Sequence, residues 1–331
     1  MKTKVKNILK QKNKTIPILS FPSTQLLGIT VNELISSSEK QVEGTKAIAE
    51  RCNVGASLNM MDLSVEAECF GAKIRFSDDD IPTVEEGCIT DISDVSRITV
   101  PELNRGKAEI YIDGVKKAKE EIKDIPVFCG VIGPYSLAGR LYDMTELMME
   151  CYDNPDAVKA LLEKSTAFIK KYILAFKKAG ADGVIMAEPA AGLLSPDLAE
   201  EFSVPYVKEI FNSVNDEDFF ICYHNCGNAV VNMCDSISSL HADIYHFGNA
   251  IEMKEILPQM PKDAVVMGNI DPILFRSGTA EEIELSIQKL YDECGSFSNF
   301  MISSGCDIPA DSKWENIDAY FKIISKIYKE V

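Results

Sequence analysis

The chain alternates short, continuously apolar runs with longer segments whose apolar residues recur every three or four positions. The short runs are rich in β-branched and aromatic residues, which is typical of strands. Most of them lack a polar alternation, as expected of parallel strands that are buried on both faces. We predict eight strands: Ile16–Phe21, Gly55–Met60, Pro126–Ile132, Gly183–Glu188, Phe219–His224, Asp243–Phe247, Ala264–Asn269 and Asn299–Ser304.

The segments between these strands carry helix signals. Asn154 and Pro155 predict a helix start, with Asn as N-cap and Pro at the first helical position. From Val158 to Phe176 the apolar residues form one stripe at helical spacing, and Gly180 can take the left-handed conformation that ends a helix. Thr279-Ala-Glu-Glu282 predicts a capping box at the start of another helix.

Eight strands interleaved with helices predict an α/β fold, a (β/α)8 TIM barrel that occupies residues 1–331 as one domain. An open doubly wound sheet is the alternative, although no Gly-x-Gly-x-x-Gly follows a strand. Residues 61–125 are too many for one crossover, so we predict an insertion between strands 2 and 3. It would contain a hairpin at Ala72–Phe76 and a helix around Leu103–Lys123. A short helix is expected within residues 1–14.

Composition excludes several classes of function. Of the 331 residues 46% are apolar, enough for a substantial core, while 34 Lys and Arg stand against 51 Asp and Glu for a net charge of −17. Such a surface repels phosphate backbones and anionic lipids, so neither nucleic acid nor a membrane is expected as a partner. Ten Cys without a secretory signal predict a reducing, cytoplasmic location, where thiols stay free or bind metal.

In a barrel, side chains at the carboxyl ends of the strands share one face, where active sites form. That rule selects a small set of candidates: Met61, Asp62, Gly133, Tyr135, Glu188, His224, Cys226, His246, Asp271 and Cys306.

Three of these candidates form a metal-ligand set. His224 and Cys226 follow the fifth predicted strand and Cys306 follows the eighth; an imidazole with two thiolates binds zinc and leaves a fourth position for a reactant. Cys222 shares the strand, but an extended chain places it roughly 13 Å from Cys226, whereas ligand atoms around zinc are about 4 Å apart. We therefore assign Cys222 to the core, and expect the chain to bend between His224 and Cys226, which the nearby Gly227 facilitates. His246 is expected to be structural.

Two carboxylates end strands immediately before a proline, in Glu188-Pro189 and Asp271-Pro272. Each is a candidate catalytic residue, and the alternative for each is an acceptor that fixes the loop.

The ligand set favours one kind of chemistry. Two thiolates cancel the charge of Zn²⁺, so a third thiolate from a substrate keeps a nucleophilic sulfur although it is deprotonated. This suits alkyl transfer to sulfur better than activation of water. Zinc–alcohol chemistry is the competing reading, but it requires a nicotinamide site that the sequence does not show.

Several segments together resemble the uroporphyrinogen decarboxylase superfamily, and within it the cobalamin-dependent methylcobamide:coenzyme M methyltransferases. The segments are Met61–Glu68 with Gly71, Gly133–Ala138, Ala179–Gly183, Glu188-Pro189, Leu194–Asp197, His224–Gly227, Met267–Pro272 and Ser304–Pro309. The resemblance implies a (β/α)8 barrel and identifies His224, Cys226 and Cys306 with the family's zinc motif. It implies methyl transfer between a corrinoid (methylcobalamin or a corrinoid protein) and a zinc-bound thiol such as coenzyme M.

The chain also departs from the family. Decarboxylase members carry an Arg-rich N-terminal loop for the porphyrin carboxylates, but Phe21–Gly28 contains no Arg or Lys, which argues against decarboxylation. Glu188-Pro189 stands where the coenzyme M enzymes have Asp-Pro. Around His246-Phe247 the chain lacks the acidic residue that is usual in the family. Three alternatives therefore remain: a decarboxylase, an enzyme that loads methyl from a small donor onto a corrinoid protein, and a non-enzymatic barrel within a corrinoid complex.

Overall fold

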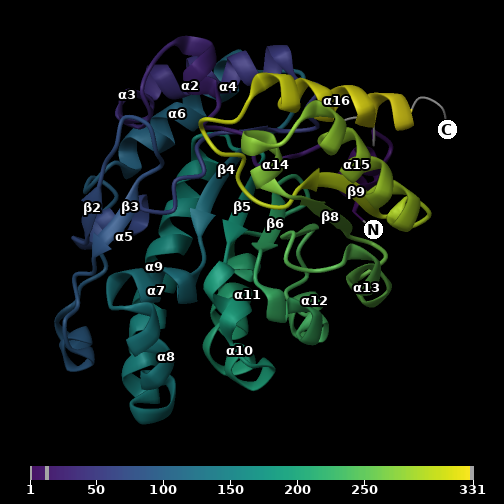
Figure 1. The fold of residues 1–331 in the computed structure, drawn as a ribbon. Helices are drawn as coiled ribbons and strands as arrows, with labels where there is room; N and C mark the ends of the chain where they lie inside the picture. The colour runs from purple at the N-terminus through teal and green to yellow at the C-terminus, as the bar shows by residue number, and fades with distance from the viewer. Residues whose placement is uncertain (1, 12–14, 329–331) are drawn as a thin grey trace.

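A curled parallel sheet forms the centre of the computed structural model, which describes residues 2–11 and 15–328. Seven described strands follow one another in the order β1-β4-β5-β6-β7-β8-β9, each paired in parallel with the next (Figure 1). Their bounds are β1 Ser57–Leu58, β4 Val127–Ile132, β5 Gly183–Ala187, β6 Phe220–Asn225, β7 Ile244–Phe247, β8 Val265–Ile270 and β9 Phe300–Ser304. Seven of the eight predicted segments therefore contain a strand.

The prediction of a strand at Ile16–Phe21 is wrong. Thr15, just before this segment, forms an isolated parallel bridge to Val54. Residues 16–21 themselves form no strand. Pro17 has no backbone N–H and cannot donate a hydrogen bond to a neighbouring strand. Side chains of β9 bond the backbone of this segment instead: Ser303 Oγ donates to the Ile16 carbonyl at 2.9 Å. The Ile18 amide donates to Ser304 Oγ at 3.1 Å. This segment thus lies beside β9 without joining the sheet.

Helices cover the outer face of the sheet (Figure 1). The longest is α9, Pro155–Lys178, which packs on β4 and α11 and buries the predicted stripe from Val158 to Phe176. Asn154 precedes it as predicted, but its side chain donates to Glu150 rather than capping the helix. Gly180 takes the left-handed conformation, with φ of 102°, and Thr279 and Glu282 form the predicted capping box.

The remaining helices are placed as follows. In the first third lie α1 Thr3–Leu9, α2 Ser23–Leu27, α3 Val31–Ile35, α4 Ser38–Arg51, α5 Val65–Phe70, η1 Ile92–Arg97 and α6 Ala108–Glu121. In the middle lie α7 Pro134–Leu141, α8 Met144–Asp153, η2 Pro189–Leu193, α10 Pro196–Phe202, α11 Val204–Val214, η3 Asn228–Asn232 and α12 Cys234–Ser238. The last third holds α13 Met253–Ile256, η4 Leu257–Gln259, α14 Pro272–Ser277, α15 Ala280–Cys294 and α16 Trp314–Ile327.

The long connection from β1 to β4 contains α5, an antiparallel hairpin and α6. The hairpin pairs β2 Lys73–Arg75 with β3 Thr83–Glu86, where the sequence predicted one. The helix predicted around Leu103–Lys123 is α6. Among the described residues, no helix is long and apolar enough to cross a bilayer.

The concave face of the sheet is filled by alternate strand residues, among them Phe128, Ile185, Cys222 and Met267, and by Val5 of α1. This helix lies at the amino ends of the strands, within the segment predicted to be helical; residues 1 and 12–14 of that segment lie outside the described residues.

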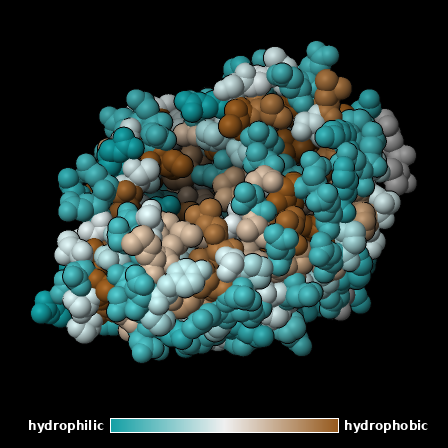
Figure 2. Space-filling view, turned by 60° about the horizontal axis from the view of Figure 1, so that its bottom comes forward, coloured by the Kyte–Doolittle hydropathy of each residue, from teal (hydrophilic) through white to brown (hydrophobic). Residues whose placement is uncertain are grey.

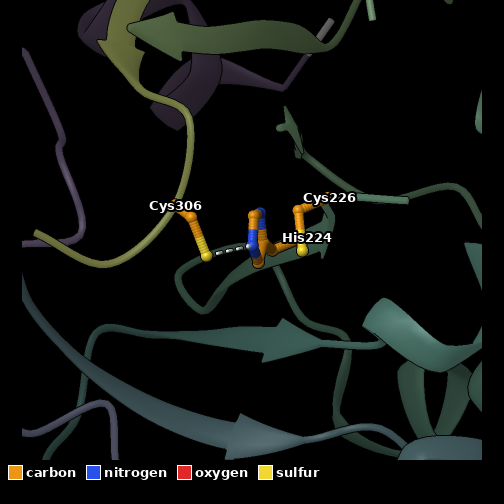
Figure 3. Close-up of side chains that lie close together, drawn as sticks. All are labelled: His224, Cys226 and Cys306. Carbon is orange, nitrogen blue, oxygen red and sulfur yellow. Dashed lines mark hydrogen bonds between the residues drawn. The ribbon is translucent and has the colours of Figure 1, made fainter. Parts of the chain in front are cut away.

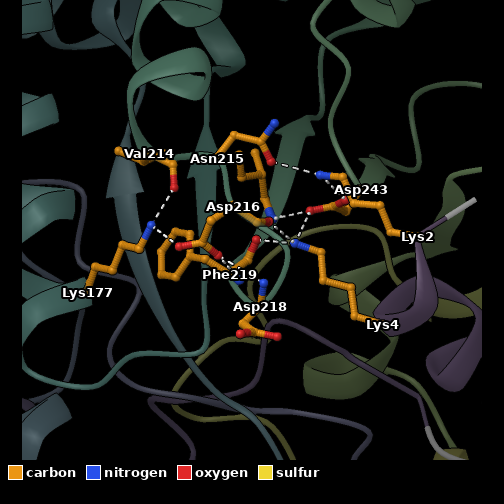
Figure 4. A network of polar contacts seen from close by, with 10 residues as sticks. Lys2, Lys4, Lys177, Val214, Asn215, Asp216, Asp218, Phe219 and Asp243 are labelled. Atoms are coloured by element: carbon orange, nitrogen blue, oxygen red, sulfur yellow. Dashed lines mark hydrogen bonds and ion pairs between the residues drawn. The ribbon is translucent and has the colours of Figure 1, made fainter.

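A buried ion pair holds α1 in place (Figure 4). Lys4 Nζ lies 3.0 Å from Asp243 Oδ2, and the two side chains are 8% and 3% exposed. Lys4 also donates to the carbonyls of Asp216 and Phe219, while Lys2 pairs with the other oxygen of Asp243 at 2.9 Å. Helix α1 is thus held at the amino ends of the strands both by ion pairs with Asp243 and by the apolar packing of Val5.

We expect Lys4→Met to lower the free energy of unfolding by about 1–3 kcal/mol, because it leaves the buried Asp243 carboxylate with fewer partners. Urea denaturation measures the change, with Lys6→Met on the exposed face of the same helix as control. Equal stability of the two variants would contradict a stabilising role for the pair.

Candidate metal centre and cavity

The three predicted ligands converge at the carboxyl edge of the sheet. His224 lies near the end of β6, Cys226 follows that strand directly, and Cys306 follows β9. The potential ligand atoms of these residues all lie within 4.8 Å of one another, and Cys306 Sγ is 3.6 Å from His224 Nε2 (Figure 3). Because β7 and β8 separate the two strands, it is the curl of the sheet that brings these side chains together.

The imidazole of His224 is held in one orientation. Its Nδ1 lies 3.2 Å from the backbone carbonyl of His246, which can only accept, so Nδ1 carries the proton and the lone pair of Nε2 faces the sulfurs. The ring of His246 lies 4.6 Å from that of His224, and its Nε2 donates to the Ser304 carbonyl at 2.5 Å. His246 therefore links β7 to β9 beneath the cluster and does not join it.

The two cysteines affect each other's ionisation. Their side-chain interaction lowers the pKa of Cys226 to about 7 and raises that of Cys306. One sulfur of the pair is therefore readily ionised near neutral pH, as a metal ligand must be.

The backbone around Cys226 bends as the ligand spacing requires. Asn225 directs the bend, because its side chain accepts from the Gly227 amide at 2.9 Å and donates to the Glu188 carbonyl at 2.9 Å. A Cβ at Gly227 would lie 2.5 Å from Gly192 Cα, so only glycine lets the loops after β5 and β6 approach this closely. Cys222 stays below on the concave face, fully buried and outside the cluster.

A cavity of about 200 Å³ opens above these ligands. Figure 2 shows this face of the molecule, with apolar side chains gathered around a hollow. The cavity is lined by Ile18, Met61, Asp62, Leu63, Ile81, Pro82, Thr83, Arg140, Ala187, Pro189, His224, Cys226, Cys306 and Asp307. Most of this wall is apolar, and Asp62, Arg140 and Asp307 are its charged members.

Glu188 follows β5 but does not line the cavity. Its carboxylate is fully buried and accepts from the Ser136 amide at 2.7 Å, the Ser136 hydroxyl at 2.9 Å and the Tyr135 amide at 3.3 Å. These groups belong to the first turn of α7, so Glu188 occupies a helix N-terminus. Burial raises its pKa to about 7. A Cβ at Gly133 would lie 1.7 Å from Glu188 Oε2, so this contact also requires glycine.

Asp271 is not brought to the cluster. It precedes α14 and its side chain accepts from the Ile273 amide at 2.9 Å, as a capping residue does. It lines a separate surface pocket with Asn249, Glu252 and Lys289. The structure thus gives Asp271 the loop-fixing position that was its alternative.

Two buried acids lie beside the cavity: Asp62, which the sequence placed among the candidates, and Glu66, which sequence reasoning missed. Asp62 Oδ2 accepts from the Tyr111 hydroxyl at 2.6 Å, and its Oδ1 accepts from Ser64. Glu66 is fully buried on α5; its Oε1 accepts from the Ile132 amide at 2.9 Å, and burial raises its pKa to about 7. An acid between the apolar residues Val65 and Ala67 was the signal that could have found it.

Residues 18–327 match the protein family described as uroporphyrinogen decarboxylase (URO-D). The chain is 25% identical over 252 residues to the methylcobamide:CoM methyltransferase MtbA of Methanosarcina acetivorans, covering 75% of this chain and 72% of that protein. It is 26% identical to MtbA of Methanosarcina mazei, over 70% and 69% of the two chains. It is also 25% identical to a uroporphyrinogen decarboxylase of Geotalea daltonii, over 83% and 81%.

Among solved structures, a methyltransferase from Methanosarcina mazei superposes with a TM-score of 0.84 at 21% identity, covering 95% of this chain and 94% of that one. These relatives confirm the expectation of an enzyme of the methyl-transfer type. The match over nearly the whole length, on a curled parallel sheet of the same fold, shows that the chain belongs to the uroporphyrinogen decarboxylase (URO-D) family.

Proposed function

We propose that this protein is a zinc-dependent methyltransferase that moves a methyl group between a corrinoid, either methylcobalamin or a corrinoid protein, and a thiol such as coenzyme M. The observation that carries the proposal is the meeting of His224, Cys226 and Cys306 at one end of a small apolar cavity. The relatives named methylcobamide:CoM methyltransferase support it.

The donor set fits zinc. One imidazole nitrogen and two sulfurs lie within 4.8 Å of one another, close to the separations of roughly 4 Å around a tetrahedral ion, and the cavity leaves room for a fourth ligand. When bound, zinc would lower the pKa of a coordinated thiol and keep its sulfur nucleophilic. The residues that would hold it are His224, Cys226 and Cys306.

The surrounding residues prepare this site for a thiol. The His246 carbonyl fixes the tautomer of His224, so its Nε2 lone pair is directed at the sulfurs. The apolar lining, including Ile18, Met61 and Ala187, keeps water from competing for the fourth position. A corrinoid is much larger than a 200 Å³ cavity, so its methyl-bearing face would meet the thiol at the mouth.

Porphyrinogen decarboxylation is the second candidate, because decarboxylases are among the relatives. Its substrate carries several carboxylates, whereas Arg140 is the one Lys or Arg among the described residues that line the cavity. This shortage of positive charge favours methyl transfer.

The decisive experiment follows the visible spectrum of methylcobalamin with the purified protein and a panel of thiols, with zinc content measured in parallel. We expect thiol-dependent demethylation and about one zinc per chain. Loss of carbon dioxide from a porphyrinogen, without demethylation, would replace this proposal by the decarboxylase. Methylation of a corrinoid protein from a small donor would reverse the direction of transfer.

We expect Glu188 to position α7 rather than to transfer protons. Glu188→Ala should lower the free energy of unfolding by about 2–4 kcal/mol, because it leaves two buried amides unpaired, and should lower activity with it. Glu188→Gln, which can still accept from Ser136, should retain most of both. Urea denaturation and the demethylation rate measure the two effects. A Gln variant that is stable but about 100-fold slower would instead indicate proton transfer.

A further inference from the structure

Two thiols of this chain lie side by side where a small molecule can reach them. Cys226 and Cys306 belong to separate loops, yet their side chains interact directly and both line the cavity above the cluster (Figure 3). Each residue is partly exposed. An oxidant that enters the cavity therefore meets two neighbouring sulfurs.

The other thiols of the chain are protected from such an oxidant. Of the ten cysteines seven are buried, and Cys88 is the third that is partly exposed. Burial raises the pKa of Cys52 and Cys69 to about 12 and that of Cys294 to about 11, and it also raises the pKa of Cys88. These groups stay protonated, whereas the reactive form of cysteine is the thiolate. Exposure and pairing together single out the two thiols in the cavity.

The two sulfurs are close enough to form a bond. The potential ligand atoms of the cluster lie within 4.8 Å of one another, and the S–S bond of a disulfide is about 2.05 Å long. The sulfurs therefore have to approach by at most about 2.8 Å, which is less than rotation about the two Cα–Cβ bonds supplies. Neither residue belongs to a helix or strand, since Cys226 directly follows β6 and Cys306 lies just beyond β9.

We propose that Cys226 and Cys306 form a reversible disulfide when hydrogen peroxide enters the cavity, so that the metal site is also a redox switch. One sulfur attacks a peroxide oxygen with its electron pair, the O–O bond breaks and hydroxide leaves. The second sulfur then attacks the sulfur of the sulfenic acid and displaces its oxygen. Two thiols lose two electrons to the peroxide, and the two thiol protons leave in two molecules of water.

The disulfide removes two of the three donors of the metal site. Its sulfurs no longer carry the charge that makes a thiolate a ligand, so His224 alone remains and the ion is released. The second sulfur also protects the first, because a sulfenic acid that condenses with a neighbouring thiol is not oxidised further to a sulfinic acid. This inference goes beyond the proposed function, since oxidation of the pair needs neither a methyl donor nor a substrate thiol.

The test exposes the zinc-loaded protein to equimolar hydrogen peroxide, with no methyl donor present. We expect release of about one zinc per chain, measured with a chromogenic chelator, and loss of two of the ten thiols, measured by thiol titration of the unfolded protein. Dithiothreitol should restore both thiols and the binding of zinc.

Peptide mapping identifies the bond. Trypsin places the two sulfurs on separate peptides, residues 209–254 with Cys222, Cys226 and Cys234, and residues 290–313 with Cys294 and Cys306. Mass spectrometry should find these peptides joined, and their fragmentation should place the bond between Cys226 and Cys306.

Two variants serve as controls. Cys88→Ser removes the third partly exposed thiol, so it should release zinc and join the peptides as the wild type does. Cys306→Ser removes the partner sulfur, so no cross-link should form, and peroxide should convert Cys226 to a sulfinic acid that dithiothreitol does not reduce.

Zinc that stays bound while the peroxide is consumed would overturn the proposal. A bond from Cys226 to any cysteine other than Cys306 would also overturn it, as would thiols that dithiothreitol does not recover. A purified protein without zinc would count against the proposed function alone, because the same two peptides would still be joined in the metal-free chain.

Discussion

Alanine at Cys226 or at Cys306 is expected to remove bound zinc and thiol-dependent demethylation of methylcobalamin together. Each sulfur supplies one of three donor atoms that lie within 4.8 Å of one another, and two donors do not form a site closed enough to hold the ion. We expect the rate to fall by more than about 100-fold, beyond the 10- to 100-fold loss typical of an outer-shell partner. Elemental analysis and the methylcobalamin spectrum measure the two losses.

Cys222→Ala provides the matched control, because Cys222 belongs to the same strand as His224 but is buried on the concave face outside the cluster. It should keep zinc and activity, with a small loss of stability. A Cys306→Ala protein that retains full turnover without metal would remove the basis of the proposed mechanism. Loss of zinc from Cys222→Ala would show that the ligand set is wrong.

The stability of the protein is expected to fall as the pH rises from about 4.5 to about 7, in part because of Glu66. Burial raises the pKa of this carboxyl to about 7 in the folded chain, against 4.5 ordinarily, so between these values the folded state binds more protons than the unfolded state. Its contribution is present below pH 4.5 and is lost through pH 7. A difference of about 2.5 in pKa corresponds to about 3 kcal/mol at 1.36 kcal/mol per unit.

Glu66→Gln should therefore be more stable than the wild type at pH 8 by about 1–3 kcal/mol, and equal to it near pH 4.5. The amide oxygen can still accept from the Ile132 amide, so the local structure is kept. Urea denaturation across this pH range measures the difference, with Glu109→Gln on the exposed face of α6 as control. A Glu66→Gln curve parallel to that of the wild type would show that Glu66 is ionised normally in the fold.

Glu188 and Asp271 show that a position at the end of a strand does not by itself place a side chain in the site. Both follow a strand and precede a proline, so the sequence treats them alike. In the structure Glu188 fastens α7 from within the protein, and Asp271 caps α14 near the surface. The direction of each side chain depends on the helix that packs against it.

Local features of the chain determined most of the fold. Continuous apolar runs located seven strands, since burial on both faces is required of each strand wherever it lies in the sheet. Helical spacing located α9 for the same reason. Ile16–Phe21 was mistaken for a strand because its composition suits one, whereas Pro17 and the side chains of Ser303 and Ser304 decide how its backbone bonds.

The sequence by itself also placed His224, Cys226 and Cys306 at one edge, because the carboxyl ends of parallel strands share that edge. Two strands separate β6 from β9, and only the tertiary structure decided that the sheet curls enough to bring these side chains together. It alone decided that Glu66 is buried and that Arg140 lines the cavity. The burial of a side chain, and the distance in space between segments far apart in the chain, depend on the curvature of the sheet and on how helices pack around it. The local pattern of apolar and polar residues does not contain this information.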